Sequence, residues 1–331
     1  MGEPLYAGLR SRAFWALIVF AAIALAALAV CPLVGGSGLD YQKLVRRERP
    51  DWNIFLQLRL PRALLALLTG SALAVSGTLF QALLRDALAT PSNLGVSAAA
   101  SLGAVIAIST AGDRERPFPL VWLFALVGAG LVIVLVVLLA QTTRRFSTFT
   151  LLLTGIAING ICLAAVLLLN SLAGITKSFQ ITHWLMGGIE AVEYSTLLVL
   201  LVVSAPVFVW ILLRARTWNV LSYGDAWAEG RGVDTRRLSI GGFIAGAVLT
   251  GTMTAVTGPI AFVGLIVPHL LRRLVGADHR VLLPAALFGG GAFLAVCDTI
   301  SRSVLAPVEI PVGVTTALLG GPFFVWLLWK R

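Results

Sequence analysis

Long apolar segments, repeated along almost the whole chain, constrain the fold more than any other feature of the sequence. Apolar residues make up 58% of the 331 positions and only 12% are charged, about half the charged fraction of an average soluble domain. A helix that crosses a bilayer needs about 20 mostly apolar residues, so this chain can supply about ten such helices. The sequence therefore predicts an all-α, multi-pass membrane protein that forms one domain over residues 1–331.

Polar or Pro/Gly-rich breaks divide the apolar sequence into ten expected spans. The first span is too long for the core of a signal peptide and lacks a clear cleavage site, so we interpret it as a membrane helix. Ten spans place both termini on one side. With cytoplasmic termini, 15 of the 25 Lys and Arg residues fall inside, as the positive-inside rule favours. The expected spans are 14–34, 60–84, 93–112, 119–141, 149–173, 195–214, 238–257, 260–275, 281–300 and 309–329.

The net charge of +10 does not indicate a nucleic-acid partner. A soluble nucleic-acid-binding protein gathers its basic residues on a hydrophilic face, whereas here they occupy short breaks between apolar runs. Cys31, Cys162 and Cys297 lie in or beside apolar segments without CxxC spacing. They indicate neither a disulfide framework nor a zinc site.

Residue patterns for catalysis are missing from the sequence. Lys43, Lys177 and Lys330 are never preceded by glycine, which excludes the Gly-Lys-Ser/Thr of a P-loop. The three histidines are far apart and lack metal-ligand spacing. A Gly-x-Ser-x-Gly elbow is also missing. We therefore expect a chain that is not an enzyme and binds no cofactor or metal of its own.

Asp298 is the acidic residue that most merits attention, because buried carboxylates inside membrane helices can couple transport to protons or sodium. It lies near the outer end of the ninth expected span. Arg302 follows four residues later, a spacing that allows the two to pair on one helix face. We expect Asp298 to be neutralised by Arg302 or by a neighbouring helix. The alternative is a stand-alone secondary transporter or channel that uses Asp298.

The inner segment 218–234 is unlike a simple loop. Its sequence predicts two short helices joined at Gly224, with exposed aromatic residues and mixed charge. Exposed apolar surface on the cytoplasmic side indicates a protein partner. An amphipathic helix lying on the membrane is the other interpretation, and these residues alone do not choose between the two.

A short internal similarity indicates an inverted repeat. Residues 74–77 read Ala-Val-Ser-Gly and residues 255–258 read Ala-Val-Thr-Gly, on the second and seventh expected spans. These spans run in opposite directions, as an inverted five-plus-five repeat requires. Gly70, Ser71, Ala74 and Gly77 also place small side chains at helical spacing, which favours close helix packing.

The longer motifs resemble the permease subunits of type II ATP-binding-cassette (ABC) importers, a FecCD-like family that carries iron–siderophore chelates, haem and cobalamin. The resemblance covers nearly the whole chain and is strongest in its last third. The matching segments are Arg59-Leu60-Pro61-Arg62, Leu94-Gly95-Val96-Ser97, Arg144 to Thr148, Gly155 to Asn159, Trp184 to Gly188, Gly258 to His269, Asp278-His279-Arg280, Glu309 to Gly313 and Gly321 to Phe324.

The resemblance implies a BtuC-like fold and a homodimer in the bacterial inner membrane, with the pathway at the dimer interface. Two copies of a separate ATPase, which would bind ATP and Mg²⁺, would dock on the cytoplasmic side. A periplasmic substrate-binding protein would dock outside. The cargo would be an iron chelate (siderophore or haem) or cobalamin.

The same resemblance assigns three sets of site residues. Segment 218–234 resembles the paired coupling helices that contact the ATPase. Arg59, Arg62 and Arg302 resemble outward-facing arginines that receive glutamates of the binding protein, and snorkelling at a helix end is their alternative. Asp86 and Leu88 resemble one cytoplasmic gate, with Ser147 and Thr148 at a second. The coupling residues are Leu221, Tyr223, Gly224, Asp225, Ala228, Arg231, Gly232 and Val233.

Two departures from the family pattern affect these sites. The family usually has Asn-Pro-Leu-Ala where this chain has Asp-Ala-Leu-Ala at 86–89. Without that proline the preceding residue loses its bias toward an extended conformation, and a charged Asp86 could repel its symmetry mate. The coupling segment usually has Leu-Gly where this chain has Arg231-Gly232. Arg231 is expected to pair with the ATPase or to reach solvent.

Overall fold

The computed structural model describes residues 3–35, 40–110, 118–142 and 148–329, and every regular element in these ranges is helical. Ten helices lie at the ten predicted spans. They are α1 (Glu3–Val30), α4 (Leu60–Leu84), α5 (Val96–Thr110), α6 (Phe118–Thr142), α7 (Thr148–Leu172), α9 (Tyr194–Leu213), α12 (Thr235–Thr257), α13 (Val263–Val275), α14 (His279–Ser303) and α15 (Val312–Trp329).

Short helices occupy the connections. They are α2 (Tyr41–Val45), α3 (Asp51–Ile54), a π-helical turn η1 (Phe55–Arg59), a 3₁₀ turn η2 (Pro91–Leu94), α8 (Ile175–Leu185), α10 (Ala215–Ser222) and α11 (Asp225–Glu229). Among the described residues, six helices are long and apolar enough to cross a membrane, and α1, α5 and α15 contain shorter apolar stretches. Helix α13 has 13 residues, about 20 Å, which is too short to cross a bilayer alone.

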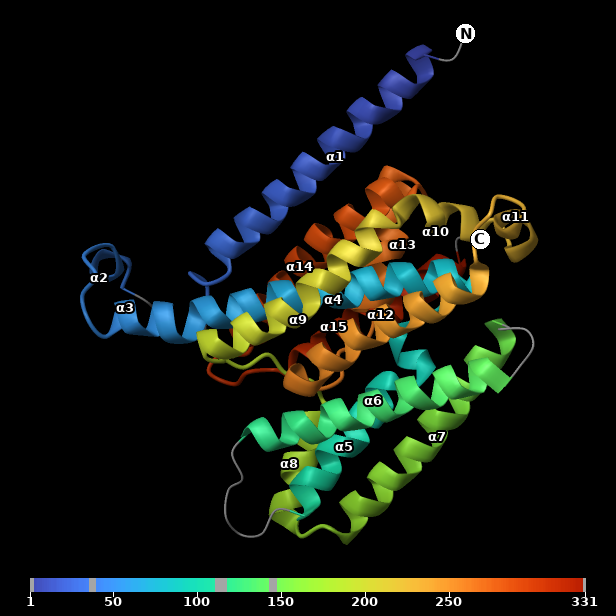
Figure 1. Ribbon diagram of the computed structural model, residues 1–331. Helices are drawn as coiled ribbons and strands as arrows, with labels where there is room; N and C mark the ends of the chain where they lie inside the picture. The colour runs from blue at the N-terminus through green and yellow to red at the C-terminus, as the bar shows by residue number, and fades with distance from the viewer. Residues whose placement is uncertain (1–2, 36–39, 111–117, 143–147, 330–331) are drawn as a thin grey trace.

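The connections separate the molecule into two ends. Helix α1 begins and helix α15 ends toward the end that carries α10 and α11, whereas α2, α3 and α8 lie toward the opposite end (Figure 1). We name these the inner and outer ends. The arrangement agrees with the expectation that both termini lie on one side.

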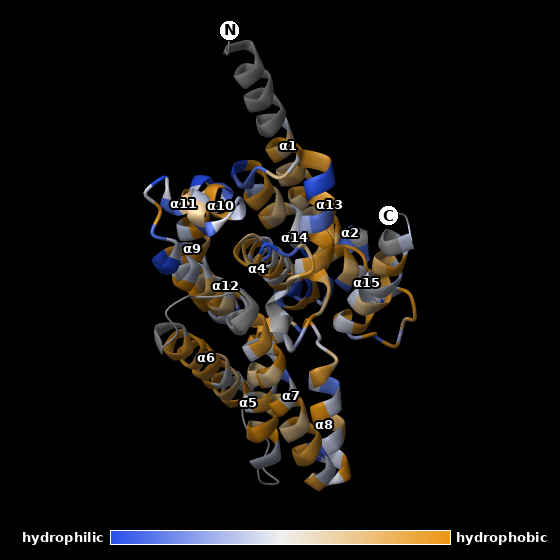
Figure 2. Cartoon of the chain, turned by 90° about the vertical axis from the view of Figure 1, so that its right-hand side faces the viewer, coloured by the Kyte–Doolittle hydropathy of each residue, from blue (hydrophilic) through white to orange (hydrophobic). Residues whose placement is uncertain are grey.

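Helix α4 forms the centre of the structure. It packs against α14, α12, α13 and α9, which surround it in Figure 2. The most apolar part of the α3–α4 segment is 78% buried within the protein, against 28% for α6 and 22% for α7. Helices α6 and α7 therefore expose leucine-rich faces at the surface of the chain, while α4 is enclosed by protein.

Small residues on α4 allow its neighbours to approach closely, as the sequence indicated. A Cβ atom at Gly70 would lie 2.2 Å from the backbone oxygen of Gly290 in α14. A Cβ atom at Gly77 would lie 2.0 Å from that of Gly264 in α13. Only glycine fits at these crossings, because real Cβ contacts are not this short.

Helices α4 and α12 are antiparallel neighbours. Thr69 contacts the sulfur of Met253 at 3.7 Å, and the rings of Phe80 and Phe243 lie 6.1 Å apart, so residue numbers rise along one helix as they fall along the other. Helix α4 packs against α13 and α14, and α12 packs against α5 and α6. This exchange of partners is the pattern of an inverted repeat in which α4, α5 and α6 correspond to α12, α13 and α14.

Candidate functional site

Residues 218–234, which we name the coupling segment, form two short helices at the inner end, as predicted. Helix α10 ends and α11 begins around Gly224, whose φ of 123° is a conformation that glycine adopts readily. A second positive φ, 77° at Gly232, turns the chain toward α12. Although this chain has Arg231 where the family usually has leucine, it keeps glycine at position 232, where the backbone has a positive φ.

The coupling segment has a buried side and an exposed side. Trp218, Leu221 and Ala228 are fully buried, and the indole nitrogen of Trp218 donates to the Ile211 carbonyl oxygen at 3.0 Å. Leu221 and Ala228, both predicted coupling residues, therefore hold the segment against its own bundle. Tyr223 is 79% exposed and is the predicted residue best placed to touch a partner.

Trp227 is a surface residue that was not among the predicted site residues. Its side chain is 52% exposed, and the Arg231 guanidinium lies 4.2 Å from the centroid of its ring. Arg231 is also exposed, so in the isolated chain it stacks on an aromatic face at the surface. We name the exposed side chains Tyr223, Trp227 and Arg231 of the coupling segment the aromatic tip.

Arg85 ties the central helix to the coupling segment and was also missed. It ends α4 in the left-handed conformation, with φ 51°. Its Nε donates to the Leu221 carbonyl oxygen at 3.3 Å, and its guanidinium pairs with the Asp225 carboxylate. Because 140 positions separate Arg85 from Asp225, no local pattern could have linked them.

The predicted gate loop follows directly after Arg85. The Asp86 side chain accepts the Leu88 backbone N–H at 2.9 Å, which closes a local turn that does not depend on proline. Leu88 is 51% exposed. At the second predicted gate, Ser147 lies outside the described residues and Thr148 begins α7, so that gate stays a prediction.

Asn219 forms a second attachment, from α10 to the start of α14. Its Nδ2 donates to the Asp278 carboxylate at 2.7 Å. Its Oδ1 accepts the backbone N–H of His279 at 2.8 Å and lies 2.7 Å from His279 Nδ1. Burial raises the pKa of Asp278, but hydrogen bonds from Arg280 and Asn219 outweigh it and lower that pKa from 3.8 to about 2. The carboxylate is therefore ionised at neutral pH.

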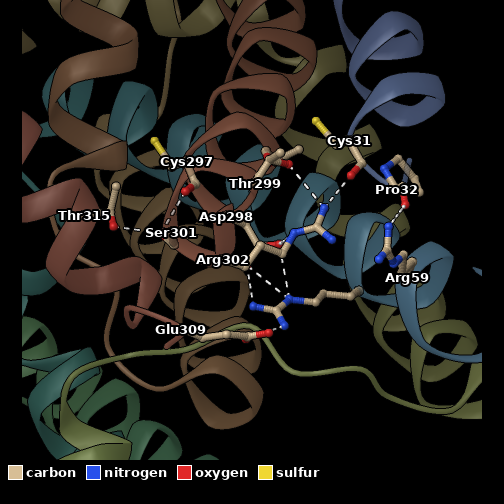
Figure 3. Close-up of polar contacts among 12 residues, drawn as sticks. Cys31, Pro32, Arg59, Cys297, Asp298, Thr299, Ser301, Arg302, Glu309 and Thr315 are labelled. Atoms are coloured by element: carbon tan, nitrogen blue, oxygen red, sulfur yellow. Dashed lines mark hydrogen bonds and ion pairs between the residues drawn. The ribbon is translucent and has the colours of Figure 1, made fainter. Parts of the chain in front are cut away.

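The outer end carries a second charged site, centred on Asp298 (Figure 3). Asp298 is 2% exposed and lies 3.0 Å from Arg62 Nη2 and 3.5 Å from Arg302 Nε. Arg62 also pairs with Glu309 at 2.8 Å, and the Glu309 side chain is 57% exposed. The expectation that Asp298 is neutralised by Arg302 or a neighbouring helix is confirmed, because both kinds of partner are present.

Arg59 and Arg302 hold the end of α1. Arg59 donates to the carbonyl oxygens of Pro32 at 3.4 Å and Leu33 at 3.2 Å, and Arg302 donates to that of Cys31. Arg59 and Arg302 are only 6% and 5% exposed, so snorkelling does not describe them. Among the three predicted docking arginines, Arg62 has the most exposed ion-pair partner. A docking role for the three stays a prediction. We name these arginines, Asp298 and Glu309 the outer cluster.

Within the described ranges, no group of three or more His, Cys, Asp or Glu residues is placed to hold a metal ion. Both charged sites are sets of ion pairs and hydrogen bonds between helices. Such an arrangement can fasten helices or exchange partners, and it offers no nucleophile paired with a base.

Comparison with known proteins decides between a permease subunit of an importer and a stand-alone transporter or channel. The model of the FecCD transport family matches residues 16–330. This chain belongs to the FecCD transport family. The permease is 41% identical over 309 residues to the hemin transport system permease protein HmuU of Yersinia pestis, covering 90% of each chain. It is 39% identical over 282 residues to the vitamin B12 import system permease protein BtuC of Salmonella newport, covering 83% of each.

The fold of the permease agrees with a solved relative. It matches a metal-chelate type ABC transporter in an inward-facing conformation with a TM-score of 0.85 and 29% identity, covering 96% of this chain and all of the other. The permease is thus a multi-pass membrane subunit of an ABC importer and not an enzyme, because ATP hydrolysis in such systems belongs to a separate subunit. The stand-alone transporter is no longer supported, and Asp298 serves to join helices.

Proposed function

We propose that two copies of the permease form the translocation pathway of a bacterial inner-membrane importer. An ATPase subunit, which binds ATP and Mg²⁺, docks on each coupling segment, and a periplasmic binding protein docks over the outer cluster. The aromatic tip carries this proposal. Trp218 and Arg85 attach the segment to the bundle, and Tyr223 and Trp227 remain exposed. This combination fits a docking surface for a protein better than a helix lying in the membrane surface.

The attachments of the coupling segment explain how ATPase motion would reach a gate. Arg85 contacts the segment at Leu221 and Asp225, and the chain continues from Arg85 into the loop that contains Asp86 and Leu88. A displacement of the segment therefore pulls on the end of α4 and on this loop. Transport then proceeds by alternating access, with no covalent chemistry in the permease.

We propose a bulky metal chelate as the cargo, and haem as the first compound to test. The support is the similarity to a hemin permease at 41% identity over 90% of both chains. An iron–siderophore chelate and cobalamin are the other members of this class. Proteoliposomes with the complete importer should take up haemin with ATP. Uptake of cobalamin or a ferric siderophore in place of haemin would redirect the assignment within the same class.

The docking surface is tested by replacing Tyr223 and Trp227 with alanine together. We expect at least a tenfold loss of the ATPase that co-purifies in mild detergent, because aromatic residues at interface centres carry about 2 kcal/mol or more each. The matched control is Phe179→Ala, which removes an aromatic that is 72% exposed on α8 at the opposite end. Retention of the ATPase by the double variant, or its loss in the control, would contradict the proposed surface.

A further inference from the structure

Helix α14 is attached to functional sites at both of its ends. At its start, Asp278 and His279 are bound by Asn219 of the coupling segment. At its end, Asp298 and Arg302 belong to the outer cluster. The helix has 25 residues, so it is about 38 Å long and reaches from the inner to the outer end of the bundle.

Helix α4 repeats this arrangement beside α14. Its inner end is tied to the coupling segment through Arg85, and its outer end carries Arg62 of the outer cluster. In between, the two helices are in backbone contact at Gly70 and Gly290, and the Ser71 hydroxyl donates to the Leu287 carbonyl oxygen at 2.6 Å. Helices this closely packed move together, because sliding one past the other would require their backbones to separate.

We propose that α4 and α14 form one rigid body that carries motion of the coupling segment to the outer cluster, and that Asn219 is the positioning residue that fastens α14 to that segment. The inference rests on the proposed docking of an ATPase at the coupling segment. It adds a path by which motion at that surface would reach the outer cluster, over which the binding protein would dock.

An asparagine suits this position because both the nitrogen and the oxygen of its side-chain amide make hydrogen bonds. Nδ2 donates to the Asp278 carboxylate, while Oδ1 accepts the His279 backbone N–H. An aspartate could still accept from His279, but it would place a second carboxylate against Asp278. Exchanging both residues, as Asn219→Asp with Asp278→Asn, restores one donor and one acceptor. Asparagine is also a good N-cap, so the exchanged pair can still begin α14.

The test uses a probe at the far end of α14. A bimane fluorophore is attached to Val308→Cys, which is 65% exposed in the loop after α14. The native Cys31, Cys162 and Cys297 are buried and leave the label specific. Fluorescence is recorded in the assembled complex with and without a non-hydrolysable ATP analogue. Because Arg85 also ties the rigid body to the coupling segment, Asn219→Asp, Asp278→Asn and the exchanged pair are made in an Arg85→Gln background. The labelled parent and Arg85→Gln alone are the references. The amount of co-purifying ATPase is measured for each.

We expect the nucleotide-induced change at Val308 to fall at least threefold in Asn219→Asp relative to Arg85→Gln alone and to recover in the exchanged pair, with the ATPase bound throughout. A pairwise rescue of this kind is direct evidence of coupling between two residues. An unchanged response in Asn219→Asp would overturn the inference, and so would a lost response that the exchange does not restore. If the labelled parent lacks an ATPase, the proposed docking itself is wrong, which is a different result.

Discussion

At the scale of single residues, burial decides what the two carboxylates around Arg62 contribute. Asp298 is 2% exposed and contacts both Arg62 and Arg302, whereas the Glu309 side chain is 57% exposed and contacts Arg62 alone. Removing a buried partner leaves an uncompensated charge in the interior. Removing an exposed partner costs little, because water already competes for the ion pair.

We therefore expect Asp298→Asn to destabilise the permease by about 3–5 kcal/mol and Glu309→Gln by about 1 kcal/mol or less. Thermal unfolding of the purified proteins in one detergent measures the difference. If Asp298→Asn unfolds at the parent temperature and yet fails to transport, Asp298 has a direct role in transport and the structural interpretation is wrong.

The sequence allowed only local residue pairs to be predicted. Asp298 and Arg302 are four positions apart, so helical geometry alone is enough to place them on one face. Arg62 was recognised through a motif, but its contacts with Asp298 and Glu309 span 236 and 247 positions. Asn219 and Arg85 were missed as site residues for the same reason. Their partners belong to helices that only the tertiary fold brings together.

At the scale of helices, apolar length predicted where each helix lies, while the contacts between helices were not predictable. The expected span 60–84 coincides with α4, and the expected span 260–275 becomes a helix only from Val263 to Val275. Small residues on α4 indicated close packing. The partners of these small residues could not be predicted, because they are glycines of α13 and α14, which lie far from α4 in the sequence.

The crossing of α4 and α14 can be tested with two adjacent glycines. A Cβ atom at Gly290 would lie 2.3 Å from the Ala74 Cβ, whereas one at Gly289 would meet its nearest neighbour at an ordinary 3.5 Å. We expect Gly290→Ala to destabilise the fold by about 1–3 kcal/mol through overpacking, and Gly289→Ala to be tolerated. Equal melting temperatures for the two variants would show that the crossing is looser than described.

At the scale of the whole molecule, charge distribution and connectivity give one orientation. The coupling segment lies at the end where α1 begins and α15 ends (Figure 1), and the positive-inside count assigned that end to the cytoplasm. The excess of basic residues on the inner side, 15 of 25, is small because other basic residues cluster near the start of α4. Arg59 and Arg62 of that cluster bind groups of the protein itself, the Leu33 carbonyl oxygen and Asp298. Their positions therefore say little about which side of the membrane they face.

Labelling of single cysteines tests this orientation. Ile175→Cys, 93% exposed at the start of α8, and Tyr223→Cys, 79% exposed in the coupling segment, lie at opposite ends. In intact spheroplasts that express the permease without its ATPase, a membrane-impermeant maleimide should label the Ile175 variant and leave the Tyr223 variant unlabelled until the cells are broken. The reverse pattern would require the outer and inner assignments to be exchanged.

The central position of α4 also has a consequence for biosynthesis. Its closest neighbours α12, α13 and α14 all come from the second half of the chain, so α4 leaves the ribosome long before they exist. Until then Gln81, which is buried in the finished protein and bonded to Arg272, lacks that partner and must face other helices of the first half, lipid, water or the insertion machinery. We therefore expect the first half of the permease to be most open to membrane chaperones and proteases before translation passes α14.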